Sequence, residues 1–173
     1  MSMALRAVGL GLASGGRSIA GLKAVATAAT PLVDSPVTGP AGAGAQALGD
    51  RVVNALSGPA GKRTVQLMQL GEVVADKLPF TPSRLAPPVL GVRAATGALS
   101  SYTLARRRTV APAVPALIGA TAALAGSVLG ARWRALATER GWPDMVAALV
   151  EDLVVLGLAT AAVRPAFPWS ARG

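Results

Sequence analysis

Long apolar runs separated by short polar breaks make up most of this chain, and several of the runs have the length of a helix that lies in a membrane. Residues 109–131 carry no charge, and this segment meets the length and polarity criteria for a membrane-spanning helix most clearly. Residues 89–105 are apolar apart from Arg93, and residues 145–163 are apolar apart from two acids near their middle. The pattern predicts a helix in each segment, with 109–131 as the clearest transmembrane helix.

The first hydrophobic stretch, residues 7–33, is interrupted by Arg17 and Lys23, and a pair of glycines, Gly15 and Gly16, comes directly before Arg17. The pair predicts a kink or a break, because glycine weakens a helix. Two interpretations are open here. In one, the glycines let another helix pack closely and Arg17 reaches the membrane interface. In the other, the first helix is broken or re-entrant, and its loosened backbone lines a polar cavity together with Arg17.

Residues 31–61 are the least regular part of the chain, because prolines and glycines punctuate them. We expect a loop here, with one short amphipathic helix over residues 43–56 that suits the membrane surface. The next segment, residues 62–78, is expected to be a helix that Pro79 ends, because proline lacks the N–H group and disfavours the helical conformation of the residue before it. No long polar linker interrupts the chain, so residues 1–173 are expected to form a single integral membrane domain.

The densest group of charged residues lies at the end of this helix and in the turn after it. Glu72 and Asp76 are four residues apart, so on a helix both carboxylates project from one face. Acids among apolar neighbours are costly in hydrocarbon unless they meet cations, polar groups or water, and Lys77 and Arg84 are the nearest candidate partners. We therefore predict a binding region in a polar interior. Its other members are the charged residues within the apolar segments: Arg17, Arg93, Glu151 and Asp152.

Glu151 and Asp152 are adjacent in the centre of the last apolar segment. Consecutive helical residues point about 100° apart, so at most one of the two can face a given cavity squarely. The other then needs a partner of its own.

The composition favours lipid as the solvent of most of the chain. Hydrophobic residues make up 52% of the sequence and charged residues only 14%, whereas a soluble domain carries about 25% charged residues. The apolar side chains are chiefly small, which suits close helix packing in a bilayer better than a filled aqueous core. The expected fold is all-α: a small polytopic transmembrane bundle with about four to five membrane-embedded helices.

Cysteine and histidine are both absent. Their absence excludes a disulfide framework, a thiolate metal site and a thiol nucleophile, and it removes the usual general base and zinc ligand. Most familiar catalytic machinery is therefore excluded, so an enzyme is the less favoured class and no cofactor is expected.

The net charge of +9 comes mainly from arginines at the ends of apolar runs. Phosphate headgroups lie at that level of a membrane, so we expect anionic lipid as the partner and no nucleic acid. Residues 132–144 are expected to form a basic polar loop, with Trp133 and Trp142 as interface anchors. Arginines flank residues 109–131 at both ends, so the positive-inside rule does not orient the chain.

A family resemblance rests on three motifs in chain order: Gly-Leu-Ala-Ser-Gly-Gly-Arg17 near the start, Gly71-Glu72 with Asp76-Lys77 and Pro79 in the middle, and Glu151-Asp152 near the end. These motifs resemble the small bacterial integral-membrane proteins grouped as a domain of unknown function, number 4126. The resemblance spans most of the chain and implies a multi-pass helical bundle in the bacterial inner membrane. It implies no activity or ligand. The sequence departs from the family pattern at residues 81–88, which are rich in proline here, so no role is carried over for that turn.

Three kinds of function fit these residues. The first is a small transporter, channel-like or lipid-handling protein whose buried acids line a polar interior. The alternative is a structural or accessory subunit of a homo-oligomer or larger membrane complex, in which the acids pair with cations to fix the helix register. The less favoured third is a metal-dependent enzyme acting on a phosphorylated lipid, with Glu72 and Asp76 on the metal and Arg84 or Arg93 on the phosphate. The sequence lacks the fuller aspartate signature of the CDP-alcohol phosphotransferases.

Overall fold

The structure, a computed structural model, describes residues 1–28, 51, 54–55, 58–75 and 85–164, with residues 68–75 described by their backbone only. Within these ranges the chain forms helices and no strand, so the all-α prediction is confirmed. The helices are α1 (Met3–Gly16), α2 (Ala20–Thr27), α4 (Pro59–Ala75), α5 (Pro87–Arg107), α6 (Ala113–Glu139) and α7 (Asp144–Val163).

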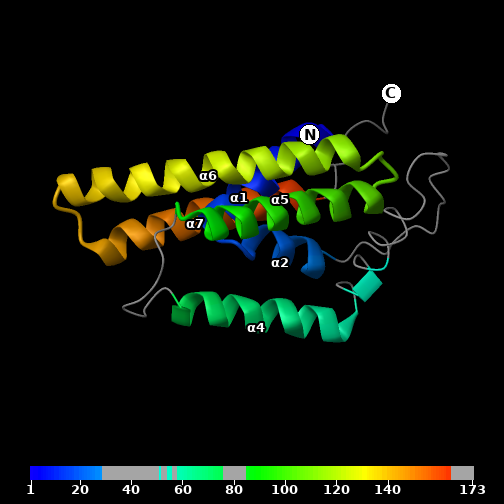
Figure 1. Cartoon of the computed structure of the whole chain (residues 1–173), viewed down its shortest axis with the longest axis horizontal. Coiled ribbons are helices and arrows are strands. Elements are labelled where there is room, and N and C mark those ends of the chain that lie inside the picture. Colours follow the sequence, from blue (N-terminus) through cyan, green and yellow to red (C-terminus); the bar gives the residue numbers. More distant parts are fainter. Residues whose placement is uncertain (29–50, 52–53, 56–57, 76–84, 165–173) are drawn as a thin grey trace, which may run out of the picture.

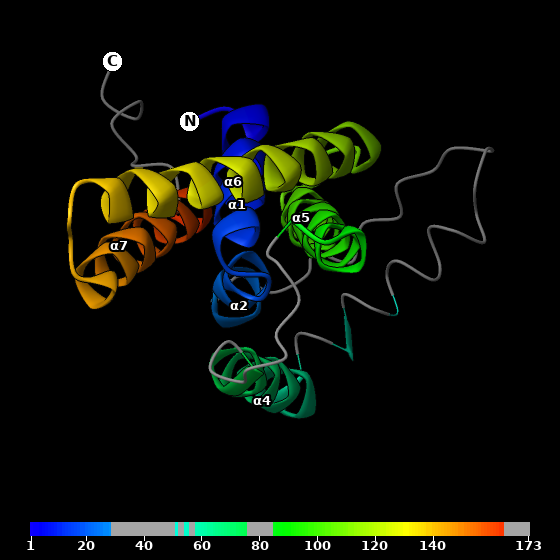
Figure 2. The ribbon, with the colours of Figure 1, turned by 60° about the vertical axis from the view of Figure 1, so that its left-hand side comes forward.

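The short helices α1 and α2 lie in the middle of the molecule. Helices α6 and α4 lie on opposite sides of the molecule, and the other helices lie between them (Figure 1). Seen from a second direction, α7 and α5 flank α1 and α2 on either side (Figure 2). The segment that meets the most neighbours is therefore the glycine-rich start of the chain.

The predicted break in the first helix is present. Helix α1 ends at Gly16 because Arg17 adopts an extended conformation, with φ −133° and ψ 117°. Helix α2 then turns back along α1, since a Cβ atom placed on Gly21 would lie 2.8 Å from the carbonyl oxygen of Leu10. The two helices have 14 and 8 residues, and a helix needs about 20 residues to cross a bilayer. The first apolar stretch is therefore a helical hairpin, and neither of its helices is long enough to span.

Among the described residues, the buried core is built mostly from small side chains and includes three local hydrophobic clusters. One joins α1, α2, α5 and α7 through Leu10, Val25, Leu104 and Ala162. A second joins α1 to α7, and a third joins the start of α2 and the preceding turn to Val65 of α4. These clusters fix where α7 and α4 lie against the central hairpin.

Helices α6 and α7 turn their large apolar side chains outward. The exposed set comprises Val114, Leu117, Leu124, Val128, Leu129 and Leu136 of α6 and Met145, Val146, Leu149, Leu153, Val154 and Leu156 of α7. Both helices are long and apolar enough to cross a membrane, yet only 33% and 28% of their most apolar windows are buried. The core helix of a soluble protein would be mostly buried, so this exposure favours a hydrocarbon surrounding.

Within the described residues, α6 and α7 are the two helices that meet this length and hydropathy criterion, so the expectation of four to five membrane-embedded helices is not confirmed. The helices predicted at 89–105 and 145–163 correspond to α5 and α7, and α4 contains the described part of 62–78. The surface helix expected over 43–56 lies mostly outside the described residues.

The basic loop expected over residues 132–144 is wrong for most of its length. Helix α6 continues through this stretch to Glu139, because its alanine, leucine and arginine residues are strong helix formers and the charges lie on its surface. The turn between α6 and α7 is confined to residues 140–143, where Gly141 has a φ of +69° that favours glycine. The two apolar helices therefore form a hairpin with a short turn.

Candidate functional site

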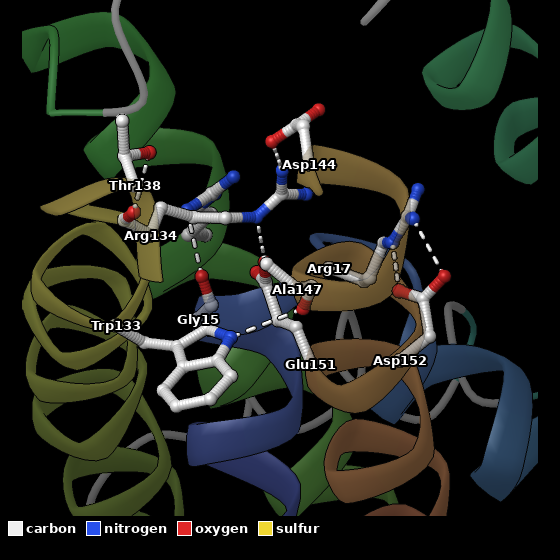
Figure 3. Close-up of polar contacts among 10 residues, drawn as sticks. Gly15, Arg17, Trp133, Arg134, Thr138, Asp144, Ala147, Glu151 and Asp152 are labelled. Carbon is white, nitrogen blue, oxygen red and sulfur yellow. Dashed lines mark hydrogen bonds and ion pairs between the residues drawn. The ribbon is translucent and has the colours of Figure 1, made fainter. Parts of the chain in front are cut away.

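Glu151 lies about two turns into α7 and is the most buried carboxylate that the structure describes, with 8% of its surface exposed. Its Oε2 accepts a hydrogen bond from Nε of Arg134 at 2.8 Å. The same guanidinium donates from Nη1 to Oδ1 of Asp144 at 2.6 Å. Arg134 of α6 thus bridges two carboxylates of α7 and ties the two helices together (Figure 3).

Asp152 points away from Glu151 and toward the break between α1 and α2 (Figure 3). Its two carboxylate oxygens accept hydrogen bonds from Nε and Nη2 of Arg17, each at 2.8 Å. A bidentate pair of this kind fixes both distance and orientation. The adjacent acids of α7 therefore have different arginine partners, as their neighbouring positions on a helix require.

Two tryptophans close the same end of the α6–α7 hairpin. Nε1 of Trp133 donates to the carbonyl oxygen of Ala147 at 3.0 Å. The ring of Trp142 meets that of Trp133 edge to face, with centroids 5.5 Å apart. These contacts add a neutral attachment between the helices beside the ion pairs.

An apolar groove of about 400 Å³ lies between α1, α6 and α7, beside Glu151. The groove is lined by Leu12 and Gly16 of α1, by Gly126, Leu129, Gly130 and Trp133 of α6, and by Val150, Glu151, Val154, Val155 and Leu158 of α7. Almost all of its lining is apolar. Its rim residues Leu129 and Val154 are 57% and 56% exposed, so the groove opens on the outer face of the two candidate spans.

Glycines on two helices make room for the second oxygen of Glu151. A Cβ atom on Gly130 would lie 3.4 Å from Oε1, and one on Gly16 would lie 4.0 Å from it. Oε1 therefore lies close to the backbones of both α1 and α6. Glu151 is the one charged residue in the lining of the groove, and its partner Arg134 lies outside that lining.

Buried arginines from other helices cap the C-terminal ends of α1, α2 and α7. Nη1 of Arg93 donates to the carbonyl oxygen of Gly15 at 2.7 Å, Nη1 of Arg107 donates to that of Val25, and Nη1 of Arg6 donates to that of Ala162 at 2.7 Å. The last carbonyl groups of a helix have no partner within it, and water that could satisfy them is missing from a membrane interior. A cation also complements the negative end of the helix dipole.

The structure brings together only part of the predicted binding region. Arg17 pairs with Asp152, and Arg93 caps the helix that ends just before Arg17. Glu151 has an arginine partner that was not predicted. Of the acidic motif, Asp76, Lys77 and Arg84 lie outside the described residues, and Glu72 is described by its backbone in α4 only.

The partner of Glu151 was missed because Arg134 was assigned to a loop. A usable signal exists in the sequence, since Arg134 and Glu151 lie at similar distances on either side of the turn at residues 140–143. Residues placed in this way face each other across an antiparallel helical hairpin. The signal appears only if α6 is expected to continue to Glu139.

No set of three or more metal-ligating side chains gathers in the part of the chain that the structure describes. Comparison with known proteins returned no match: no family model, no curated protein and no solved structure resembles this chain significantly. The site must therefore be interpreted from its own chemistry.

Proposed function

We propose that this chain is a lipid-handling protein of the bacterial inner membrane, which it crosses more than once, and that its groove holds one acyl chain of a bilayer lipid. The inner-membrane location follows the family resemblance of its motifs. The groove between α1, α6 and α7 carries the proposal, because it opens where the two candidate spans are covered with exposed leucine and valine.

The position of the groove supports a lipid occupant. In a bilayer, the exposed faces of α6 and α7 contact hydrocarbon, so the groove opens directly onto acyl chains. Bilayer lipids are then the molecules at highest concentration at its mouth. A water-soluble ligand would have to enter through the same hydrocarbon.

The size and lining of the groove support the same occupant. Its volume of about 400 Å³ falls within the range of roughly 300–1,000 Å³ that is common for small-molecule sites. An ion or proton path needs polar groups along its length, whereas this groove is polar only at the Glu151 end. The lipid-handling form of the function is therefore favoured over the channel-like form.

A structural or accessory role in a membrane complex is the second candidate, and the ion pairs favour it. Arg134 holds Glu151, and Arg17 holds Asp152 through two hydrogen bonds. Buried ion pairs can specify how helices align without adding much net stability. In that role the outer face of α6 and α7 would bind another polypeptide in place of an acyl chain.

The test fills the groove from its rim. Val154→Trp places a large ring at the groove, and Leu153→Trp places the same ring on the same helix at a position that does not line the groove. Each variant is purified in mild detergent, and the lipid that stays bound is counted by native mass spectrometry. We expect the tryptophan at position 154 to abolish the retained lipid and the tryptophan at position 153 to leave it unchanged.

A second measurement uses Trp133, which lines the groove. With the other two tryptophans replaced by phenylalanine, lipid brominated on its acyl chain should quench Trp133 fluorescence, and Val154→Leu should preserve the quenching. Equal lipid retention by both tryptophan variants would overturn the lipid proposal. If the protein forms dimers and only the position-154 variant fails to form them, the structural role would be supported instead.

A further inference from the structure

A second cluster of charge lies at the other end of the bundle, where α1 begins and where α5 and α7 end. Arg6 of α1 and Arg108, which follows α5, donate to the same acceptor, the backbone carbonyl oxygen of Arg164. The distances are 2.6 Å from Nη1 of Arg6 and 3.1 Å from Nη2 of Arg108. One carbonyl oxygen therefore holds two guanidinium groups close together, and the Arg164 side chain starts from the same residue.

This end of the bundle holds like charges without a described acid. The four acidic side chains that the structure describes, Glu139, Asp144, Glu151 and Asp152, all belong to the end of α6 and the first half of α7. Burial, and after it the positive charge of Arg108, lowers the pKa of Arg6 below the ordinary value of arginine. The close approach of the guanidinium groups therefore has an electrostatic cost, which an anion would offset.

Hydrogen-bond donors remain at this end. Nε of Arg108 is buried and has no hydrogen-bond partner in the described part of the chain. Arg6 uses its Nε and Nη1 groups on the carbonyl oxygens of Met1, Ala162 and Arg164, which leaves its Nη2 group available with respect to the described residues. The side chain of Arg164 is exposed. Three arginines from three helix ends thus offer N–H groups from one region.

We propose that Arg6, Arg108 and Arg164 form a binding site for the phosphate group of an anionic membrane lipid. Guanidinium groups match phosphate oxygens with paired hydrogen bonds, and the phosphate would neutralise their mutual repulsion. The site belongs to the opposite end of α7 from the ion pairs of Glu151 and Asp152, so it does not rest on the lipid-handling proposal.

The level of the site along α7 identifies a lipid phosphate as the ligand. After Asp152, helix α7 is apolar up to Val163, its last residue, and Arg164 follows immediately. A span that ends in this way places the next residue where hydrocarbon gives way to headgroups. Arginines at that level attract the anionic lipids of a leaflet, at about 1 kcal/mol for each residue near the surface.

The test compares two double variants of the full-length protein. Arg108→Gln with Arg164→Gln removes two charges from the site and keeps the backbone carbonyl of residue 164. Arg132→Gln with Arg140→Gln removes two exposed charges near the other end of α6. Binding of phosphatidylglycerol is titrated in detergent and followed by native mass spectrometry. We expect the first pair to weaken binding by about tenfold or more and the second to change it less than about twofold.

Further arms separate the sources of phosphate and protect against misfolding. Phosphatidylcholine, whose headgroup has no net charge, should bind weakly, and inorganic phosphate should not displace phosphatidylglycerol at equal concentration. Arg108→Lys should bind phosphatidylglycerol more tightly than the Arg108→Gln, Arg164→Gln pair does, because lysine keeps the charge without the planar fork. The circular dichroism of the lysine variant should match that of the unmodified protein. Equal losses in the two double variants, or full displacement by inorganic phosphate, would overturn the proposal.

Discussion

The two sides of α6 are attached to the rest of the bundle in different ways. Toward α1 and α5, helix backbones touch: a Cβ atom on Gly15 would lie 2.3 Å from the carbonyl oxygen of Ala123, and one on Gly119 would lie 2.3 Å from that of Gly97. Toward α7, the same helix leaves a groove of about 400 Å³ and is joined by Arg134, which holds Glu151 and Asp144.

The difference shows two ways of holding helices together. Close backbone contact gains dispersion energy and needs small residues where the helices meet, so it leaves no space. Charge pairs act at the tips of long side chains and keep the backbones apart, so they hold a groove open. The first side fixes the bundle, and the second side leaves a groove between α6 and α7.

The largest effect is expected on the close-packed side. Gly119→Leu puts a branched side chain where a Cβ atom would already lie 2.2 Å from Oγ of Ser101 and 2.3 Å from the backbone of α5. We expect the free energy of unfolding to fall by more than about 3 kcal/mol, because neither helix can move without breaking other contacts. Denaturant unfolding in detergent, followed by circular dichroism, measures the loss.

The matched control is Gly91→Leu, since a Cβ atom on Gly91 of α5 meets nothing within 4 Å. This change should be neutral or stabilise the protein by up to about 1 kcal/mol, because leucine forms helix better than glycine. If both leucine variants unfold at the same denaturant concentration, helices α5 and α6 do not cross in this way.

A smaller loss is expected from the charged side. Arg134→Met removes the cation from Glu151, whose side chain is 7% exposed and would then be left without this partner. We expect a loss of about 2 kcal/mol, which is less than for a fully buried pair because the Arg134 side chain is itself 22% exposed. Arg132→Met, on the exposed surface of the same helix, should change the unfolding free energy by less than about 0.5 kcal/mol. Equal effects of the two changes would mean that Arg134 does not hold α7.

The smallest effect comes from two glycines one turn apart in α6. A Cβ atom on Gly126 would lie 2.7 Å from the carbonyl oxygen of Leu12, whereas one on Gly130 would lie 3.4 Å from Oε1 of Glu151 and touch no backbone. Gly126→Ala should therefore cost about 1–2 kcal/mol, and Gly130→Ala should stay within about 0.5 kcal/mol of the unmodified protein. Thermal unfolding of the two variants side by side gives the comparison, and the reverse order would contradict it.

The helices themselves were largely predictable. Apolar segments with few charges identified α5, α6 and α7, because helix length and hydropathy are local properties of the sequence. The Gly15-Gly16 pair likewise predicted the end of α1. The end of α6 was misplaced because arginines were taken to mark a loop, although arginine is a good helix former and its side chain can lie on a helix surface.

The candidate site was predictable only in part. The two acids of α7 were identified as needing partners, and Arg17 was named among the candidates. Arg134 was not, because its role depends on α6 and α7 forming an antiparallel pair. The capping of helix ends by Arg6, Arg93 and Arg107 also had no local signal, since each of these arginines meets a carbonyl group far away in the sequence.

By itself the sequence determined that this chain is helical, rich in small residues and poor in groups for acid–base or thiol chemistry, because composition and hydrophobic period act locally. Only the tertiary structure decided that the start of the chain folds into a central hairpin, that Glu151 and Asp152 have different partners, and that a groove separates α6 from α7. The physical reason is that these features depend on which surfaces of the helices pack against one another. Glycine contacts and arginine side chains decide this pairing, and they join residues more than a hundred positions apart in the sequence. Examples are the contact of Gly15 with Ser127 and that of Arg17 with Asp152.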